Sequence, residues 1–338
     1  MNSISELSRL PTAATALPIA VAPRAPSLWR GGLAAAAAWG VAAALTFAWP
    51  DLTPLARTGL FAGLLGLAAL ALAVVATLFG QSERLTRLRA LDRWLVALPA
   101  LLTAWQILTA KTGLLPLPFF PSPQSILEVY TDDAARLVES AVHSLLLLVP
   151  GYLIGGLAGF TAGVSIGWSR AVSYWAHPIL RFVGPLPATA WLPIAFFVFP
   201  GTTSAVAFLI ALSTGFPVAV LTSSGIGSVN RHYYDIARTL GATPRFLIAR
   251  VAIPAALPHV FVGLFMGLGA SFAVLIVAEM MGVKAGLGWY LQWAQGWAAY
   301  ANLYAALIVM SLLFSGAISL LFLVRDRALA WQKGIVRW

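Results

Sequence analysis

Long apolar runs separated by short polar segments dominate the hydrophobic pattern of this chain. A bilayer core of about 30 Å is crossed by a helix of about 20 apolar residues. Eight runs approach or exceed this length, and none shows the short alternating pattern of a membrane β-barrel strand. The pattern predicts an all-α polytopic membrane protein with about eight transmembrane helices, at residues 31–49, 58–79, 94–112, 140–168, 177–199, 203–225, 259–281 and 302–324.

The fourth predicted span carries a glycine at every fourth position, at 151, 155, 159, 163 and 167. Glycines at this spacing share one helical face and let a neighbouring backbone approach closely. Gly163-Val164-Ser165-Ile166-Gly167 also matches the Gly-x-Ser-x-Gly pattern of serine hydrolases, which makes Ser165 an alternative nucleophile. A nucleophile elbow needs a strand-to-helix turn, whereas this series continues one helix, so the pattern favours helix packing.

The fifth predicted span is rich in proline, at 178, 185, 187, 193 and 200. An interior proline frees a carbonyl from the helical ladder. In hydrocarbon, such groups are tolerated only where protein or a water-filled cavity satisfies them. We therefore expect this span to face the protein interior and to border a pathway. Polar or unwound groups in spans five to seven supply the candidate translocation path: Pro187, Thr189, Trp191, Ser213, Thr214 and Glu279.

A polar but helix-patterned segment, RHYYDIARTLGATPRFLIARVAIPAALP, separates the sixth and seventh spans at residues 231–258. Asn230 is a favourable N-cap, and Gly241 suits the left-handed position after a helix end. Thr243 and Pro244 then restart a helix as cap and first residue, and we expect Pro254 and Pro258 to break or bend it. The segment predicts an ordered helix–turn–helix at the membrane face, with one apolar side available for lipid or for a partner.

Composition and charge agree with a membrane protein. The chain has 338 residues, of which 60% are hydrophobic and only 9% charged, whereas about a quarter of the residues of soluble domains are charged. There is no cysteine, which excludes disulfides and thiolate metal sites. The four histidines match no ligand spacing, and we expect no metal site.

The net charge of +10 is explained by membrane topology without a nucleic-acid partner. If the first helix starts in the cytoplasm, 16 Arg and Lys lie inside and 4 outside, with one near an inner boundary. The positive-inside rule then places both termini in the cytoplasm.

The helix–turn–helix segment resembles the docking loop of binding-protein-dependent ABC importer permeases. That loop has the pattern Glu-Ala-Ala, three residues, Gly, nine residues, Ile-x-Leu-Pro. Here Asp235-Ile236-Ala237 is followed by Gly241 and Val251-Ala252-Ile253-Pro254 at the same spacing. Further stretches, among them PFFPSPQSILEVY and AEMMGVKAGLGWYL, resemble the subfamily that imports nitrate, sulfonates, taurine and bicarbonate.

The resemblance implies a permease subunit with no enzymatic activity, in the bacterial inner membrane. It further implies a coupling helix inserted into a separate ATPase subunit, formed by Arg231, Tyr233, Tyr234, Asp235, Ala237, Arg238, Leu240 and Gly241. The chain lacks the Gly-x-x-x-x-Gly-Lys-Ser/Thr motif, so ATP and magnesium would be held by partner ATPases. The implied partners are two ATPase subunits, a second permease copy, a periplasmic substrate-binding protein and membrane lipid, with no nucleic acid.

Glu279 is the only acidic residue deep within a predicted span, and such residues are functional candidates by default. In an ion-coupled secondary transporter, the alternative function, Glu279 would be the coupling carboxylate. Such carriers usually contain inverted repeats, and the sequence contains none that we detect. In a permease, Glu279 either helps to close the outer side or accepts internal hydrogen bonds, and both interpretations stay open.

The resemblance covers about residues 92–330 and implies the six-helix core of a type I importer. The domain plan is a disordered cytoplasmic N-terminus followed by two additional helices, a cytoplasmic linker, the core with its coupling loop, and a basic cytoplasmic tail. The corresponding residues are 1–30, 31–80, 81–93, 94–324 with the loop at 229–258, and 325–338.

Overall fold

The computed structural model describes residues 29–79, 85–184 and 186–332, which contain helices and no strand. The predicted disordered segment lies outside the described residues apart from Trp29 and Arg30. The chain forms two compact units, one made of residues up to Pro50 and Thr58–Ala104, the other of Asp51–Arg57 and the chain from Trp105 onward. The boundary therefore falls inside a helix, after Ala104.

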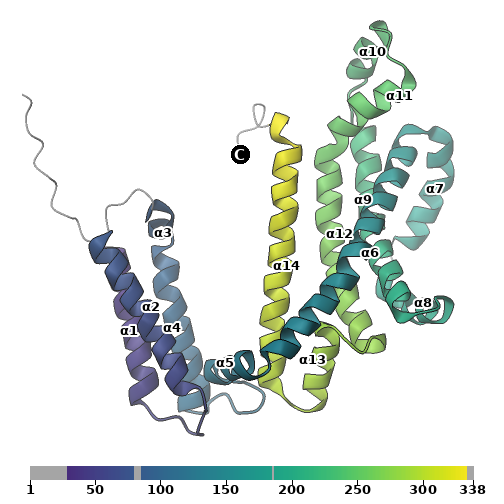
Figure 1. The fold of residues 1–338 in the computed structure, drawn as a ribbon. Helices are drawn as coiled ribbons and strands as arrows, with labels where there is room; N and C mark the ends of the chain where they lie inside the picture. The colour runs from purple at the N-terminus through teal and green to yellow at the C-terminus, as the bar shows by residue number, and fades with distance from the viewer. Residues whose placement is uncertain (1–28, 80–84, 185, 333–338) are drawn as a thin grey trace, which may run out of the picture. The chain divides into compact units, whose positions relative to one another are not determined.

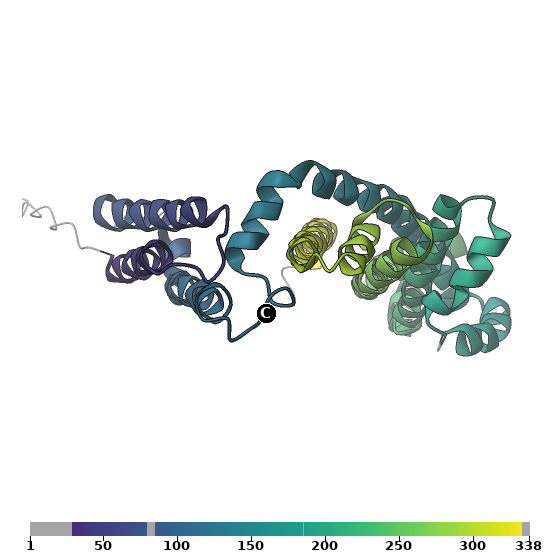
Figure 2. The same cartoon turned by 90° about the horizontal axis from the view of Figure 1, so that it is seen from below.

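The first unit is built from small and apolar residues. Its helices are α1 (Arg30–Ala48), α2 (Thr58–Leu78), α3 (Thr86–Ala90) and α4 (Asp92–Gln106), which continues into the second unit. Alanines such as Ala35 and Ala76 are fully buried, so α1 and α2 approach closely along their length (Figure 2). Two indole N–H groups hold α4 to this pair, because Trp29 Nε1 donates to Asp92 Oδ1 at 2.9 Å and Trp39 Nε1 to the Leu95 carbonyl at 3.0 Å.

The second unit contains the remaining helices (Figure 1). They are η2 (Ile107–Lys111), α5 (Pro123–Asp132), α6 (Ala134–Trp168), α7 (Arg170–Val183), η3 (Ala188–Trp191), α8 (Leu192–Val198), α9 (Thr202–Gly227), α10 (Arg231–Thr239), α11 (Pro244–Phe246), η4 (Leu247–Ala252), α12 (Ile253–Gly282), α13 (Leu287–Gly296), α14 (Tyr300–Ala328) and η5 (Ala330–Gln332). The helices η2 and η4 are π-helical, and η3 and η5 are 3₁₀-helical.

Within the described residues, seven helices are long and apolar enough to cross a membrane. The predicted fifth span is not one rod, because Arg170–Val183 and Ala188–Val198 meet at 86°. If this bent pair counts as one span, the number becomes eight, as the hydrophobic pattern predicts. The prolines of this region explain the bend, because each removes a donor from the helical ladder.

The glycine series of α6 packs against α9. A Cβ atom at Gly155, Gly159 or Gly163 would lie less than 3.0 Å from a backbone carbonyl oxygen of α9. On α12, a Cβ atom at Gly263 would lie 2.9 Å from the Cα atom of Val218 on α9. The helices α6 and α12 therefore both pack closely on α9 with almost no side chain between the backbones, as expected for small residues in lipid.

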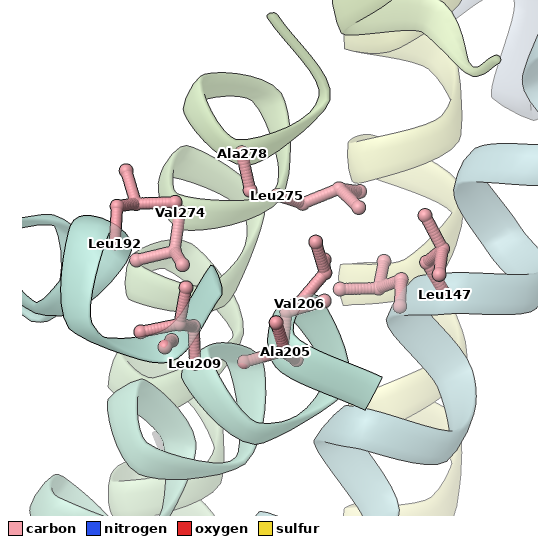
Figure 3. Packing of buried hydrophobic residues seen from close by; sticks show 11 residues of the cluster. Leu147, Leu192, Ala205, Val206, Leu209, Val274, Leu275 and Ala278 are labelled. Atoms are coloured by element: carbon pink, nitrogen blue, oxygen red, sulfur yellow. The ribbon is translucent and has the colours of Figure 1, made fainter. Parts of the chain in front are cut away.

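Larger apolar side chains complete this core at the end of α9 nearest α8 (Figure 3). Leu147 of α6, Leu209 of α9 and Leu275 of α12 belong to one buried cluster, which Leu192 of α8 joins. Because all four are buried, the three long helices and α8 form one packed body.

The loop 51–57 belongs to the second unit and is bonded to it at three points. Lys111 Nζ lies 2.8 Å from Asp51 Oδ1, and both side chains are almost fully buried. The Leu52 N–H donates to the Ala110 carbonyl, and Arg57 forms an ion pair with Asp132 at 2.6 Å. This loop is therefore an ordered part of the second unit.

We expect Pro254 and Pro258 to break or bend the helix before the seventh span, and the expected break is wrong. Residues Pro244–Gly282 form one helical run of 39 residues, with Pro254 in the first turn of α12 and Pro258 inside it. Pro254 supplies no backbone N–H and follows the π-helical turn closely, at the point where the hydrogen-bond pattern of the helical run changes. The preceding π-helical turn η4 accommodates the change in hydrogen bonding.

Candidate functional site

The helix α10 begins and ends as its sequence predicts. Asn230 accepts a hydrogen bond from the His232 N–H through its side chain at 3.0 Å, which caps the helix. Gly241 has φ +83°, the left-handed conformation that suits glycine after a helix end. Thr243 then caps the next helical turn through the Phe246 N–H, with Pro244 in its first position. Local sequence alone therefore sets the bounds of this helix–turn–helix.

One face of α10 is apolar and open. Tyr233 is 63% exposed, Ile236 59% and Leu240 83%, although all three lie outside the helices that could cross a membrane. Phe246, which follows in α11, is 51% exposed. Ile236 and Phe246 are absent from the predicted coupling-helix residues, although Ile236 lies within the matched motif and on the apolar face that the helical period predicts.

Tyr234 lies on the opposite side of α10 and packs on its own chain. Its ring lies edge-on to Trp168 at the end of α6, with 5.9 Å between centroids. Both rings border a buried cluster formed by Ile226, Ala252 and Ala256, and burial raises the pKa of the Tyr234 hydroxyl. Tyr234 thus attaches α10 to the ends of the long helices.

The polar side of α10 borders a cavity of about 540 Å³. Arg170, Arg231 and Arg238 line it together with one acidic residue, Asp235. Arg238 and Asp235 form a 3.5 Å ion pair that is more than 60% exposed on both sides, so solvent screens it and it contributes little to stability. Positive charge therefore predominates on this side.

A smaller cavity of about 320 Å³ lies between α10 and α11. Its walls are Ala237, Leu240, Gly241, Ala242, Thr243 and Phe246. The open apolar residues and this cavity form one continuous surface, because Leu240 and Phe246 belong to both.

Most of the predicted path residues lie around a larger cavity of about 600 Å³ in the second unit. Pro187, Thr189 and Trp191 line it from the bend before α8, and Ser213 lines it from α9. The other walls are mainly apolar residues of α7, α9 and α12, and no charged side chain is among them. The structure thus brings four of the six predicted residues together.

Thr214 and Glu279 lie away from this cavity. Thr214 is fully buried between α9 and α12, where its hydroxyl contacts Ser271 and donates to the Ile210 carbonyl. Glu279 is also fully buried and accepts hydrogen bonds from Ser144 and from the Gly288 N–H, each at 2.7 Å. Of the two interpretations of Glu279, the geometry favours an internal hydrogen-bond acceptor.

Ser165 lies inside the continuous helix α6, and its hydroxyl donates to the Thr161 carbonyl at 2.8 Å. A serine within a helix ordinarily forms this bond to the carbonyl four residues earlier. The backbone at Ser165 lacks the strand-to-helix turn of a nucleophile elbow. Among the described residues, no group of three or more His, Asp and Glu side chains could hold a metal ion.

Comparisons with known proteins agree with this geometry. The family model described as "Binding-protein-dependent transport system inner membrane component" matches residues 151–331, which contain the large cavity and α10. The bicarbonate transport system permease protein CmpB of Synechococcus elongatus is 29% identical over 198 residues, covering 58% of this chain and 68% of CmpB. The nitrate import permease protein NrtB of the same species is 26% identical over 252 residues, covering 72% and 88%.

A probable ABC transporter permease protein of Brucella abortus is 30% identical over 249 residues, which cover 73% of this chain and 98% of that relative. The family match covers more than half of the chain. The chain therefore belongs to the binding-protein-dependent transport system inner membrane components and is a permease subunit of an ABC importer.

Proposed function

We propose that α10 is the coupling helix of this permease and that its open apolar face docks into a separate ATPase subunit. The observation that carries the proposal is the exposure of Tyr233, Ile236 and Leu240 beyond the ends of the long helices. Tyrosine is among the side chains that most often dominate the energetics of protein interfaces, and burial of Ile236 and Leu240 would add the transfer free energy of their apolar surface. The adjoining cavity between α10 and α11 offers a place for one side chain of the ATPase.

The end of the second unit that carries α10 is the cytoplasmic end in this proposal. The concentration of Arg170, Arg231 and Arg238 there agrees with the positive-inside rule. Both termini then lie in the cytoplasm, and the opposite end, with α5 and α13, faces the periplasmic binding protein. One coupling helix per chain and two ATPase subunits per transporter require two permease chains, which we propose are two copies of this one.

We propose a small oxyanion as the solute. Two relatives carry names that specify bicarbonate and nitrate, which are planar monoanions with three oxygen atoms. The large cavity offers hydroxyl groups from Thr189 and Ser213, but its lining residues include no cationic side chain. A path without a fixed positive charge releases an anion easily, so recognition would take place mainly in the binding protein.

The docking proposal is tested with single cysteines, since the chain contains none of its own. Leu240→Cys should cross-link to the ATPase subunit in purified complexes, whereas Leu67→Cys, 63% exposed on α2, should not. A complex that is active but never cross-links from α10 would contradict the coupling role. Gly241→Val should also reduce ATPase binding, because a β-branched residue at φ +83° is strained by about 1–2 kcal/mol.

The energy source separates this function from the ion-coupled alternative. In proteoliposomes containing the whole transporter, uptake should continue when a protonophore and a sodium ionophore collapse the ion gradients while ATP is supplied. Uptake that stops under these conditions, with ATP hydrolysis intact, would favour a carrier mechanism.

A further inference from the structure

Glu279 is buried in the last turn of α12. That end of α12 lies opposite α10 (Figure 1). The helical run from Pro244 to Gly282 contains 39 residues, so it extends about 58 Å at 1.5 Å per residue. It starts at Pro244, after the short turn that follows α10, and ends beside α13. Beyond that turn, a displacement of α10 has an uninterrupted helical path to the opposite end of the unit.

Glu279 joins three elements at that end. Its Oε1 accepts from the Ser144 hydroxyl of α6 at 2.7 Å, and its Oε2 accepts from the Gly288 N–H in the first turn of α13 at 2.7 Å. The Ser144 hydroxyl in turn accepts from the Leu287 N–H at 2.9 Å. Two N–H groups at the start of α13 are thus satisfied by one carboxylate and one hydroxyl from other helices.

The local backbone is shaped to fit this carboxylate. Gly286 has φ +103°, and a Cβ atom at Gly286 or Gly288 would overlap the Glu279 side chain. The first N–H groups of a helix have no intrahelical partner and carry partial positive charge. The Glu279 carboxylate therefore attracts the start of α13 and holds it against α12. Burial of an ionisable side chain in a membrane-spanning helix costs free energy, which makes a functional role for Glu279 the default expectation.

The rest of α13 is held to α6 and α14 by separate contacts. The Tyr290 hydroxyl donates to Asp133 at 2.6 Å and accepts from the Asn302 amide at 2.7 Å. Arg136 lies over the Trp293 ring at 5.0 Å. Just beyond α13, Trp297 is 76% exposed. From α12, the helix that leads back to α10, Phe272 and Ile276 pack against the apolar side of α13, and Glu279 supplies the polar contact.

We propose that Glu279 is a positioning residue that locks α13 to the end of α12, so that movement of α10 reaches the surface around Trp297. This inference rests on the proposed coupling role of α10. In the locked state, α12 and the start of α13 move together. Without the carboxylate, α13 is held to α12 only by apolar packing and by the short connection 283–286, so α13 follows α12 less closely and coupling between the two surfaces weakens.

The test uses Glu279→Gln in the complete transporter with its binding protein and ATPases. Glutamine preserves the shape but removes the negative charge and one acceptor. We expect assembly and basal ATP hydrolysis to be retained. The ATP hydrolysis stimulated by the binding protein, and the amount of solute transported per ATP, should fall about tenfold, which corresponds to the loss of one hydrogen bond to a charged group. Glu139→Gln, an exposed position on α6, is the matched control and should behave as the unchanged protein.

Two further readouts separate coupling from a simple structural role. Ser144→Ala should lower coupling in the same direction, and the double variant should be no worse than Glu279→Gln alone, because both act in one network. A spin label at Gly296→Cys should become more mobile in Glu279→Gln even without ATPase present. Unchanged coupling, additive losses, or losses that follow only the amount of folded complex would overturn the proposal.

The spin-label experiment distinguishes failure of this proposal from failure of the proposed docking role. If the label reports no change in α13 when the charge is removed, the lock does not exist, whatever α10 binds. If the label responds but the ATPase fails to contact α10, the lock is retained and the coupling role of α10 is wrong.

Discussion

Truncation of Leu240 is the most direct quantitative test of how α10 binds its partner. The side chain is 83% exposed, so it contributes little to the fold of the isolated chain. Changing leucine to alanine removes three carbon atoms, each with about 0.8 kcal/mol of transfer free energy when buried. If the ATPase fully buries Leu240, binding gains this free energy for the 83% of the side chain that is exposed beforehand. Loss of the three carbon atoms in Leu240→Ala should therefore weaken the binding free energy by about 2 kcal/mol.

A loss of about 2 kcal/mol corresponds to a dissociation constant raised by about 30-fold. This change can be measured by recording the association and dissociation of the purified ATPase subunit on permease nanodiscs held on a sensor surface. We expect the dissociation rate to carry most of it, because mutations in one interface change the association rate much less.

The control is Leu67→Ala, which makes the same chemical change at an exposed position of α2 that lies outside the residues matched by the family model. It should leave the dissociation constant unchanged. Tyr234→Ala has a different expected signature, because its ring packs on Trp168 and its loss should lower the thermal stability of the α10 region as well as binding. An effect of Leu240→Ala smaller than about threefold, or equal to that of Leu67→Ala, would refute burial of this face in the ATPase.

Three further predictions concern packing, the ordered loop and Ser165. Gly159→Val should prevent stable folding, because its side chain would overlap the backbone of α9, whereas Gly316→Val in α14 has open space and should fold normally; detergent size-exclusion profiles distinguish them. Lys111→Met should destabilise the second unit by about 3–5 kcal/mol, because it leaves the buried Asp51 carboxylate without its cation. The double variant Asp51→Asn with Lys111→Met should recover most of this stability, as measured by thermal unfolding. Ser165→Ala should transport at the original rate, since its hydroxyl bonds only within α6 in the structure, and a clear loss would support the hydrolase alternative.

The sequence by itself determined the membrane class, the approximate positions of the spans and the bounds of α10. These features depend on few neighbours. A span needs only enough consecutive apolar residues to cross the bilayer, and a cap is decided within about four residues, as the bond from the His232 N–H to Asn230 and the left-handed Gly241 confirm. The glycine series likewise identified the closely packed face of α6, although not the helix that it meets.

The tertiary structure decided which helices pair and which way ambiguous side chains point. Tyr233 and Tyr234 are adjacent and chemically identical, yet only Tyr234 meets Trp168, because the end of α6 lies on that side of α10. Glu279 depends on Ser144, 135 positions away in the chain, and no local pattern connects the two. Partners that are distant in sequence come together only when α6, α9 and α12 pack. The inward side of α10 and the role of the buried carboxylate therefore follow from the assembled fold.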